Sequence, residues 1–218
     1  MIIFYFIINA TIVSTIMCLA DRINHHIPLS KQRSFCFNCQ HQLKWFDTLP
    51  IVSALLTLGK CRYCHYSFGL YYAIIEGSVA FWLTHVGTHP HPYITMLLLL
   101  FLSIEDQFNH TAHTWILYPW LGYLTLRYFN HLNLWLILFL SLLLIYLALF
   151  RRSLGSGDIP VILVIAVISN TERLIWILLL SSIIAIIYGK AKAKHVLPFI
   201  PIITLGFLLV TTYVDAVT

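Results

Sequence analysis

The stretch from Leu134 to Phe150 reads LWLILFLSLLLIYLALF and contains no charged residue. A helix rises about 1.5 Å per residue, so an apolar run of this length spans most of a bilayer core of about 30 Å. Similar runs recur along the chain, in which 60% of the 218 residues are hydrophobic and 10% are charged. A typical soluble domain is about 25% charged. The composition therefore excludes a soluble protein and indicates an integral membrane protein.

The apolar runs are continuous and lack the period-two alternation of a membrane-spanning β-barrel. We therefore predict an all-α integral membrane protein with about eight transmembrane helices. The predicted helices cover residues 2–20, 67–87, 92–109, 114–129, 131–150, 159–169, 172–190 and 196–214. The sixth is short for a bilayer, so we expect it to extend backward or to sit among its neighbours. The predicted organisation is a first transmembrane helix (1–20), a loop (21–66) and a multi-helix core (67–218), with no internal repeat.

The basic residues predict the orientation in the membrane. If eight helices alternate in direction, eleven of the 13 Lys and Arg residues fall on one side. They are Arg22, Lys31, Arg33, Lys44, Lys60, Arg62, Arg151, Arg152, Lys190, Lys192 and Lys194. Because basic residues gather in cytoplasmic loops, this pattern predicts a multi-pass protein of the plasma membrane with its N-terminus outside and loop 21–66 in the cytoplasm. It also accounts for the net charge of +5, so no nucleic-acid partner is expected.

The cytoplasmic loop carries two C-x-x-C pairs, Cys36 with Cys39 and Cys61 with Cys64. Two such pairs about 20 residues apart have the spacing of a tetrahedral zinc site to which each pair supplies two thiolates. Four protein ligands leave no open position for a substrate, so we expect a structural zinc ion. Two disulfides are the alternative, but they require an oxidising compartment. The fold prediction therefore includes a zinc-binding cytoplasmic loop.

Two carboxylates are predicted at similar depth on the cytoplasmic side. Asp106 lies near the end of the third predicted helix, and Asp158 comes just before the sixth. A carboxylate costs about 2.5–3.5 kcal/mol at the bilayer centre on insertion scales, and less near the interface. Asp158 could simply cap its helix, with Pro160 in the first turn. Gly155 and Gly157 favour a functional role instead, because glycines let the backbone turn tightly and approach another group closely.

Several motifs resemble those of the type IV prepilin peptidases, in the same order along nearly the whole chain. RSFCFNC at 33–39, WFDTLPIVS at 45–53, GKCRYC at 59–64 and the downstream Glu76 resemble the cytoplasmic loop of that family. GSGD at 155–158 matches its G-x-G-D motif, and HVLPFIPIITLG at 195–206 resembles its closing P-F-x-P segment. The combination is similar to the smaller, competence-type leader peptidases of Gram-positive bacteria.

The resemblance implies an intramembrane aspartyl endopeptidase with Asp106 and Asp158 as its catalytic residues. The implied substrates are prepilin or pseudopilin precursors, from which a short basic leader is removed. Two close carboxylates cannot both ionise easily, so one keeps a proton and the pair supplies both an acid and a base. Glu105 adjoins Asp106 and is the alternative for the first catalytic position. Acidic groups such as Asp21 and Asp47 could hold the basic leader.

Many members of the family also methylate the new N-terminus with S-adenosylmethionine. The resemblance leaves this second activity open, because no glycine-rich nucleotide motif is present. Glu76, inside the second predicted helix, could belong to such a site or could pair with a buried polar group. His110 and His113 lie near Asp106 in sequence, but we expect solvated or interfacial histidines rather than a second metal site.

Two other classes of protein share some of these features. A non-enzymatic transporter or scaffold with a zinc-stabilised loop would use its intramembrane charges as an ion path, and it predicts no paired carboxylates. Another G-x-G-D membrane protease, related to signal-peptide or preflagellin peptidases, is the second possibility. The four-cysteine loop argues against it.

Overall fold

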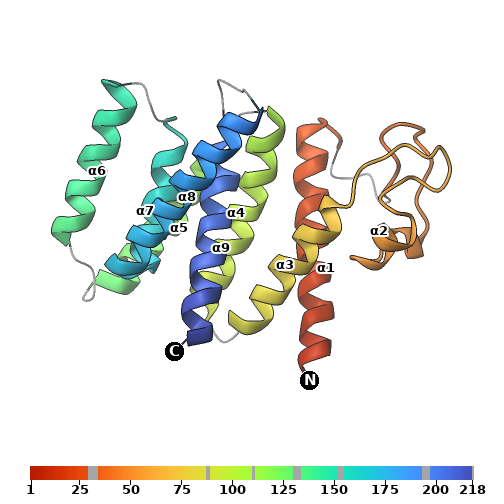
Figure 1. Cartoon of the computed structure of the whole chain (residues 1–218), viewed down its shortest axis with the longest axis horizontal. Helices are drawn as coiled ribbons and strands as arrows, with labels where there is room; N and C mark the ends of the chain where they lie inside the picture. The colour runs from red at the N-terminus through yellow and green to blue at the C-terminus, as the bar shows by residue number, and fades with distance from the viewer. Residues whose placement is uncertain are drawn as a thin grey trace. The chain divides into compact units, whose positions relative to one another are not determined.

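The structure is a computed structural model that describes residues 1–28, 34–86, 89–109, 111–129, 134–151, 155–192 and 197–217. Within the described residues every named element is a helix, and no strand is present (Figure 1). The helices are α1 (Ile2–Asn24), α2 (Val52–Leu56), α3 (Tyr71–Val86), α4 (Pro90–Asn109), α5 (Leu117–Tyr128), α6 (Leu134–Leu149), α7 (Asp158–Ile168), α8 (Thr171–Lys192) and α9 (Phe199–Val217). Two short 3₁₀ helices, η1 (Trp45–Thr48) and η2 (Thr114–Ile116), complete the set. The prediction of an all-α protein is confirmed.

Each of the eight predicted helices corresponds to a long helix of the structure, with ends shifted by a few residues. Within the described residues, two helices are long and apolar enough to cross a membrane, α1 and the Thr171–Lys190 part of α8. Eight membrane spans therefore stay a prediction. Of the basic residues used to predict orientation, four lie outside the described residues: Lys31, Arg33, Arg152 and Lys194. His110 lies outside them as well.

The chain divides into two compact parts, residues 1–89 and residues 90–218. In the first part α1 packs along α3. One face of α1 is buried at Ala10, Val13, Met17 and Ala20, a spacing of three and four residues that follows the helical period. A polar contact joins the two helices where the Asn9 side-chain amide donates to the Thr84 hydroxyl at 3.1 Å.

In the second part α7 occupies the centre. It contacts α4, α5, α6, α8 and α9, and Val161, Val164 and Ile165 have no exposed surface. An 11-residue helix rises only about 16 Å, which is too short to cross a bilayer alone. Its apolar side chains pack against the neighbouring helices, as expected for the sixth predicted helix.

The helices α8 and α9 approach each other closely at Gly206. A Cβ atom there would overlap the Ser181 hydroxyl and would lie 3.1 Å from the Ile177 carbonyl oxygen. We expect Gly206→Ala to destabilise the protein by about 1–3 kcal/mol, because an extra methyl group in a tightly packed contact forces the helices apart. Thermal denaturation in detergent measures the effect.

Gly122→Ala in α5 is the matched control, because a Cβ atom at Gly122 meets no described residue within 4 Å. An equal effect of the two substitutions on the melting temperature would contradict close packing at Gly206.

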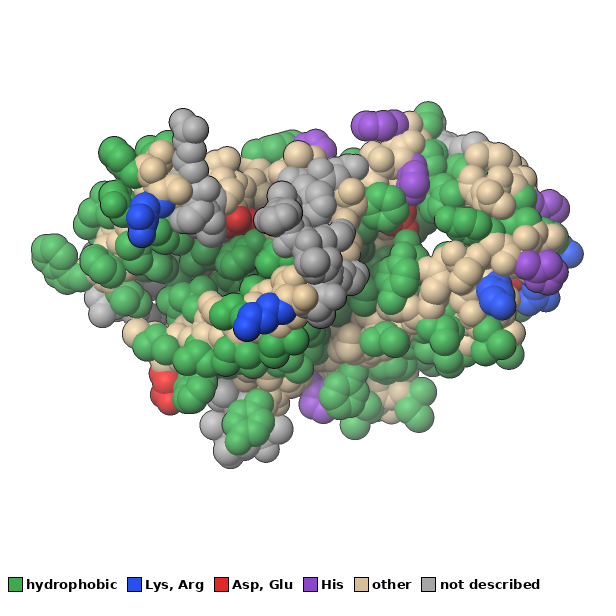
Figure 2. Space-filling model, turned by 45° about the horizontal axis from the view of Figure 1, so that its top comes forward, with side chains coloured by type: hydrophobic (Ala, Val, Ile, Leu, Met, Phe, Trp, Pro, Cys, Tyr) green, Lys and Arg blue, Asp and Glu red, His purple; other side chains and the backbone are tan. Residues whose placement is uncertain are grey.

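Large hydrophobic side chains cover much of the surface, and charged side chains are sparse on the face that Figure 2 shows. On α6 alone, Trp135, Phe139 and Leu142 are 83%, 65% and 59% exposed. Exposed apolar patches of this kind are unfavourable in water and normal against lipid. The surface therefore agrees with the membrane environment that the composition indicates.

Candidate active site and metal centre

The two C-x-x-C pairs form two loops with the same backbone geometry, offset by 25 residues. In the first, the Cys36 amide donates to the His41 carbonyl and the Gln40 amide donates to the Cys36 carbonyl, at 3.0 and 2.9 Å. In the second, the Cys61 amide donates to the Tyr66 carbonyl and the His65 amide to the Cys61 carbonyl, at 2.8 and 2.9 Å. An isolated β-bridge closes each loop, Phe35 with Gln42 and Lys60 with Ser67. This local repeat was not predicted.

The two loops bring all four cysteine sulfurs together. Their Sγ atoms lie within 4.8 Å of one another, and the Cys36 and Cys64 sulfurs are 3.8 Å apart. A tetrahedral site with Zn–S bonds of about 2.3 Å requires sulfur–sulfur separations of roughly 3.8 Å. All four cysteines are free thiols, not disulfides. The arrangement can bind a metal ion, as the sequence predicted.

The loops shift the acidity of two of the four thiols in opposite directions. A hydrogen bond from the Tyr66 backbone lowers the pKa of the Cys64 thiol to about 6, against the desolvation that raises it, and the Asn38 side chain, 3.7 Å from the sulfur, adds to the lowering. At Cys39 a hydrogen bond from the His41 backbone lowers the pKa, but desolvation and the neighbouring thiols outweigh it and raise the pKa to about 11. Since the thiolate is the metal ligand, Cys64 is the better prepared of the two to bind a metal ion.

A glycine contact supports the second loop. Gly59 has a φ of +67°, which side-chain-bearing residues rarely adopt, and a Cβ atom there would lie 2.6 Å from the backbone carbon of Gly69. The Gly59 carbonyl accepts hydrogen bonds from the Phe68 and Gly69 amides at 2.9 and 3.0 Å. The glycine of the G-x-C-x-x-C motif is thus required by the backbone itself.

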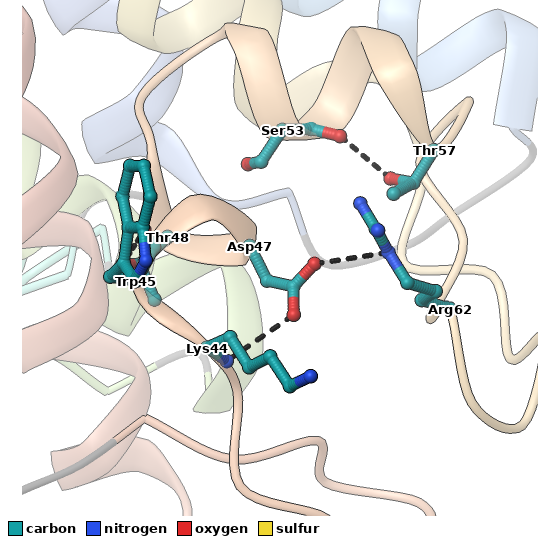
Figure 3. Close-up of polar contacts among 7 residues, drawn as sticks. All are labelled: Lys44, Trp45, Asp47, Thr48, Ser53, Thr57 and Arg62. Carbon is teal, nitrogen blue, oxygen red and sulfur yellow. Dashed lines mark hydrogen bonds and ion pairs between the residues drawn. The ribbon is translucent and has the colours of Figure 1, made fainter.

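Asp47 links the segment between the two loops to the second of them (Figure 3). One carboxylate oxygen lies 3.2 Å from Nε of Arg62, between Cys61 and Cys64, and the other accepts from the Lys44 amide at 3.2 Å. The Asp47 side chain is only 6% exposed. The acidic residue of the W-x-D-x-x-P element therefore fixes the fold of the loop.

Glu76 in α3 pairs with a polar group of the protein, which was one of the two roles expected for it. Its Oε2 accepts a hydrogen bond from the Ile51 amide at 2.7 Å. Ile51 has a φ of +60°, an unfavourable conformation for a β-branched residue, just before α2 begins. The carboxylate of Glu76 stabilises this strained turn.

The two aspartates lie in the second part of the chain, each beside the start of a helix. Asp106, in the last turn of α4, is buried, and its Oδ2 accepts a hydrogen bond from the Ile200 amide in the first turn of α9 at 3.2 Å. Asp158 is the first residue of α7. The α4, α7 and α9 helices contact one another (Figure 1). Because free N–H groups at a helix start stabilise negative charge, both positions suit a carboxylate.

The structure brings the two carboxylates near each other. The charge of Asp106 acts electrostatically on the Asp158 carboxylate. Asp158 also accepts a hydrogen bond from the Gly155 amide at 3.2 Å, which closes a tight turn before α7. Two residues 52 positions apart in the sequence are thus close enough for the charge of one to act on the other.

The glycines of the G-x-G-D motif have specific neighbours. A Cβ atom at Gly155 would lie 3.1 Å from Oδ2 of Asp158, and one at Gly157 would lie 3.3 Å from the Thr114 hydroxyl. Gly155 therefore leaves room for the carboxylate, and Gly157 leaves room for η2. A close approach was expected here, but the neighbouring groups come from the protein itself.

Glu105, the alternative to Asp106, is 1% exposed and already bonded. Its Oε2 accepts from the His113 amide at 3.0 Å, and its Oε1 lies 2.9 Å from Nδ1 of His113. The His113 side chain is 59% exposed, which agrees with an interfacial histidine. Glu105 thus attaches the segment after α4 to the end of that helix. Sequence reasoning missed this pair.

The family model and the similar proteins that match this chain are all named as peptidases. Residues 7–89 match the family model of the Bacterial Peptidase A24 N-terminal domain. The match ends where the first compact part of the chain ends.

Over most of its length the chain is similar to proteins named Prepilin leader peptidase/N-methyltransferase. The protein of Vibrio cholerae serotype O1 is 28% identical over 206 residues, which cover 84% of this chain and 81% of that protein. The protein of Bacillus subtilis (strain 168) is 25% identical, with 90% and 88% covered, and that of Pseudomonas aeruginosa is 24% identical, with 85% and 73% covered. No solved structure matches the chain.

Residues 7–89 thus resemble the N-terminal domain of bacterial A24 peptidases. Over most of its length the chain is similar to prepilin leader peptidases, in agreement with the motifs of the sequence.

Proposed function

We propose that this chain is a prepilin leader peptidase that removes the short leader from type IV prepilin or competence pseudopilin precursors. The observation that carries the proposal is the acidic pair formed by Asp106 and Asp158 in a chain that is similar to prepilin leader peptidases over most of its length. A non-enzymatic transporter or scaffold is not favoured, because the similar proteins are named as enzymes over most of the chain.

The acidic pair supports a general acid–base mechanism with Asp106 and Asp158 as catalytic residues. The ionised carboxylate takes a proton from water, and the resulting oxygen nucleophile attacks the carbonyl carbon of the scissile peptide bond. The protonated carboxyl group donates its proton to the carbonyl oxygen. When the C–N bond breaks, the carboxyl group that took the proton from water gives it to the leaving nitrogen, and the other carboxylate takes a hydroxyl proton from the collapsing tetrahedral intermediate, so the pair again holds one proton. The pair titrates as a unit, so neither residue has a fixed role.

We assign zinc to the four-cysteine cluster, because four thiolates with tetrahedral spacing are the ligands that structural zinc prefers. The ion would hold the two loops together and would take no part in the chemistry at Asp106 and Asp158. We also include N-methylation of the new N-terminus with S-adenosylmethionine, since the similar proteins carry N-methyltransferase in their names.

The proposed location is the bacterial plasma membrane. The chain would cross it several times, with its N-terminus outside and the four-cysteine loop in the cytoplasm. This topology would put the acidic pair near the cytoplasmic boundary, where the leader joins the apolar segment of a precursor.

Co-expression with a pseudopilin precursor tests the proposed function. We expect the wild-type chain to shorten the precursor on a gel, and mass spectrometry of the product to reveal an N-terminal methyl group. A precursor left intact across a panel of pseudopilins would contradict the peptidase assignment. A shortened product without the methyl group would contradict only the proposed N-methylation.

Glu105→Gln separates the two acidic neighbours in α4. The amide keeps an acceptor for the His113 amide but loses the charge that faces the His113 ring. We therefore expect the free energy of unfolding to fall by about 1.5–3 kcal/mol and cleavage to be retained. Melting temperature and cleavage rate are measured together. Loss of cleavage without loss of stability would transfer the catalytic role from Asp106 to Glu105.

A further inference from the structure

The short helix α2 turns its large apolar side chains away from the protein. Val52, Leu55 and Leu56 lie on one side of the helix, three and four residues apart, and all three are exposed. Leu56 is 74% exposed, and Leu58 just past the helix is 68% exposed, whereas Ala54 on the opposite side of α2 is buried. A cluster of exposed leucines is unfavourable in water, so the outer side of α2 favours an apolar partner.

The contacts between α1 and α3 give the depth at which α2 lies. The Tyr72 hydroxyl donates to Asp21 at 2.8 Å, and with the polar contact described above this fixes the antiparallel register of the two helices. In that register Glu76 of α3 lies level with Met17 of α1. The Ile51 amide donates to Glu76 at 2.7 Å, so α2 begins about 6 Å from the level of Asp21, toward the middle of α1. Figure 1 shows α2 beside α1 and α3 and not beyond the end of α1.

This depth has a meaning in the membrane. The first charged residues of α1 are Asp21 and Arg22, which follow an uncharged run from residue 1 to residue 20. In the proposed location α1 crosses the membrane, so these two residues mark the boundary between acyl chains and headgroups. The start of α2 then lies inside that boundary. Interfacial helices bury their apolar faces at a similar depth of about 5–10 Å.

The backbone around α2 is suited to an apolar environment. After the helix, the amides of residues 57–60 all donate to carbonyl groups within residues 53–57, at 2.8 to 3.3 Å. Before the helix, the Ile51 amide donates to the Glu76 side chain. An N–H group without an acceptor is costly in contact with lipid. Glu76 therefore supplies an acceptor that lets the start of α2 lie at this depth.

Residues that suit the membrane–water interface flank α2. Trp45 is 76% exposed, and Figure 3 shows its ring directed away from Asp47 and Arg62. Trp is enriched at membrane interfaces. Lys44 and Lys60 are exposed, and lysine places its stem on apolar surface while its ammonium group reaches the headgroups. Asp47, the one acid between the two lysines in the sequence, is paired with Arg62. The segment therefore has no free acid that would repel lipid phosphates.

We propose that residues 44–60 lie in the cytoplasmic leaflet of the membrane, where the outer side of α2 contacts the acyl chains of phospholipids. Trp45, Lys44 and Lys60 lie at the headgroups. The depth favours lipid over a protein partner from the cytoplasm, which would not reach below the headgroups. The segment thus holds the two cysteine loops against the membrane. The proposal rests on the proposed location, because the depth of α2 is counted from the boundary that α1 sets.

Photo-crosslinking of the full chain in nanodiscs of phosphatidylethanolamine and phosphatidylglycerol tests the proposal. The photoreactive residue p-benzoylphenylalanine replaces Leu56 or, as a second variant, Trp45. Ile7, 57% exposed in the apolar part of α1, is the control position for acyl chains. Phe37, whose ring stacks on that of His25 just past the end of α1, is the control position outside the leaflet. Mass spectrometry identifies lipid adducts, and gel mobility identifies protein adducts.

We expect lipid adducts at Leu56, Trp45 and Ile7, and their loss at Phe37. Two results would overturn the proposal. In one, Ile7 is labelled by lipid while Leu56 forms adducts with protein only or forms none. In the other, Phe37 is labelled by lipid as strongly as Leu56, which contradicts the depth counted along α1. If the Leu56 variant is absent from the membrane fraction, the Trp45 variant decides in its place, because there an aromatic residue replaces another.

Precursor cleavage by the same preparations separates this proposal from the proposed function. Cleavage with lipid adducts at Ile7 but not at Leu56 rejects lipid contact of α2 and keeps the peptidase. Lipid adducts at Leu56 without cleavage do the reverse. A lack of lipid adducts at Ile7 as well rejects the proposed location and, with it, the position of α2 in the leaflet.

Discussion

Asp158→Asn is expected to lower the rate of precursor cleavage by about 10²–10⁴-fold, the usual contribution of a general acid or base. Asn has the same shape as Asp and keeps an oxygen that can accept the hydrogen bond from the Gly155 amide. The turn before α7 should therefore persist while the ionisable group is lost. Asp106→Asn should have an effect of similar size, because the pair works as one unit. Gel mobility of a co-expressed precursor measures both.

Glu172→Gln is the matched control, because it makes the same chemical change in the first turn of another helix of the second part, α8. It should leave cleavage unchanged. Full processing by Asp158→Asn would mean that Asp158 only caps α7. A variant absent from the membrane fraction would have to be replaced by Asp158→Glu, which keeps the charge but moves it.

The second large effect is expected when all four cysteines of the cluster are replaced with Ser. We expect bound zinc to fall from one ion per chain to none, because hydroxyl groups do not replace thiolates as ligands. Backbone hydrogen bonds, the two β-bridges and the Asp47–Arg62 ion pair also hold the loops, but only the metal would join all four cysteines, so its loss should lower the stability of this region. Metal analysis of the purified chain and limited proteolysis of residues 34–69 measure the two consequences.

Cys18→Ser makes the same substitution outside the cluster. Cys18 is a free thiol in α1 whose sulfur lies 3.9 Å from the Ser34 hydroxyl. Zinc content should not change in this variant. Equal zinc in the wild type and the four-serine variant would reject the proposed zinc site.

The long helices were predictable because their apolar runs are uninterrupted and are bounded by Pro, Gly and charged residues. The five residues of α2 and the 3₁₀ helix η1 were not predicted, since they are shorter than any periodic signal, and η2 was predicted as the first turn of the helix over 114–129. They depend instead on tertiary contacts, such as the hydrogen bond from Ile51 to Glu76.

The metal cluster could be predicted from the cysteine spacing alone. The prediction that Asp106 and Asp158 lie at similar depth also required the order and direction of the helices. The matching geometry of the two cysteine loops was hidden, because it resides in the backbone and not in the residues between the cysteines. The signal in the sequence was the constant offset of 25 positions between the two cysteine pairs. In the structure, Gln40 and His65 at equivalent positions of the two loops both have positive φ. The partners of Glu105 and Glu76 could not be predicted, because each depends on a turn whose path the sequence pattern does not specify.

The two cysteine loops have a consequence for how the protein matures in the cell. A metal ion held by Cys36, Cys39, Cys61 and Cys64 closes a ring of chain, and the entropy lost on ring closure must be met by metal–thiolate bonds. A chain made without the metal would then combine folded helices in its second part with an incompletely folded first part. Supply of the metal would set the fraction of new chains in which both parts are folded.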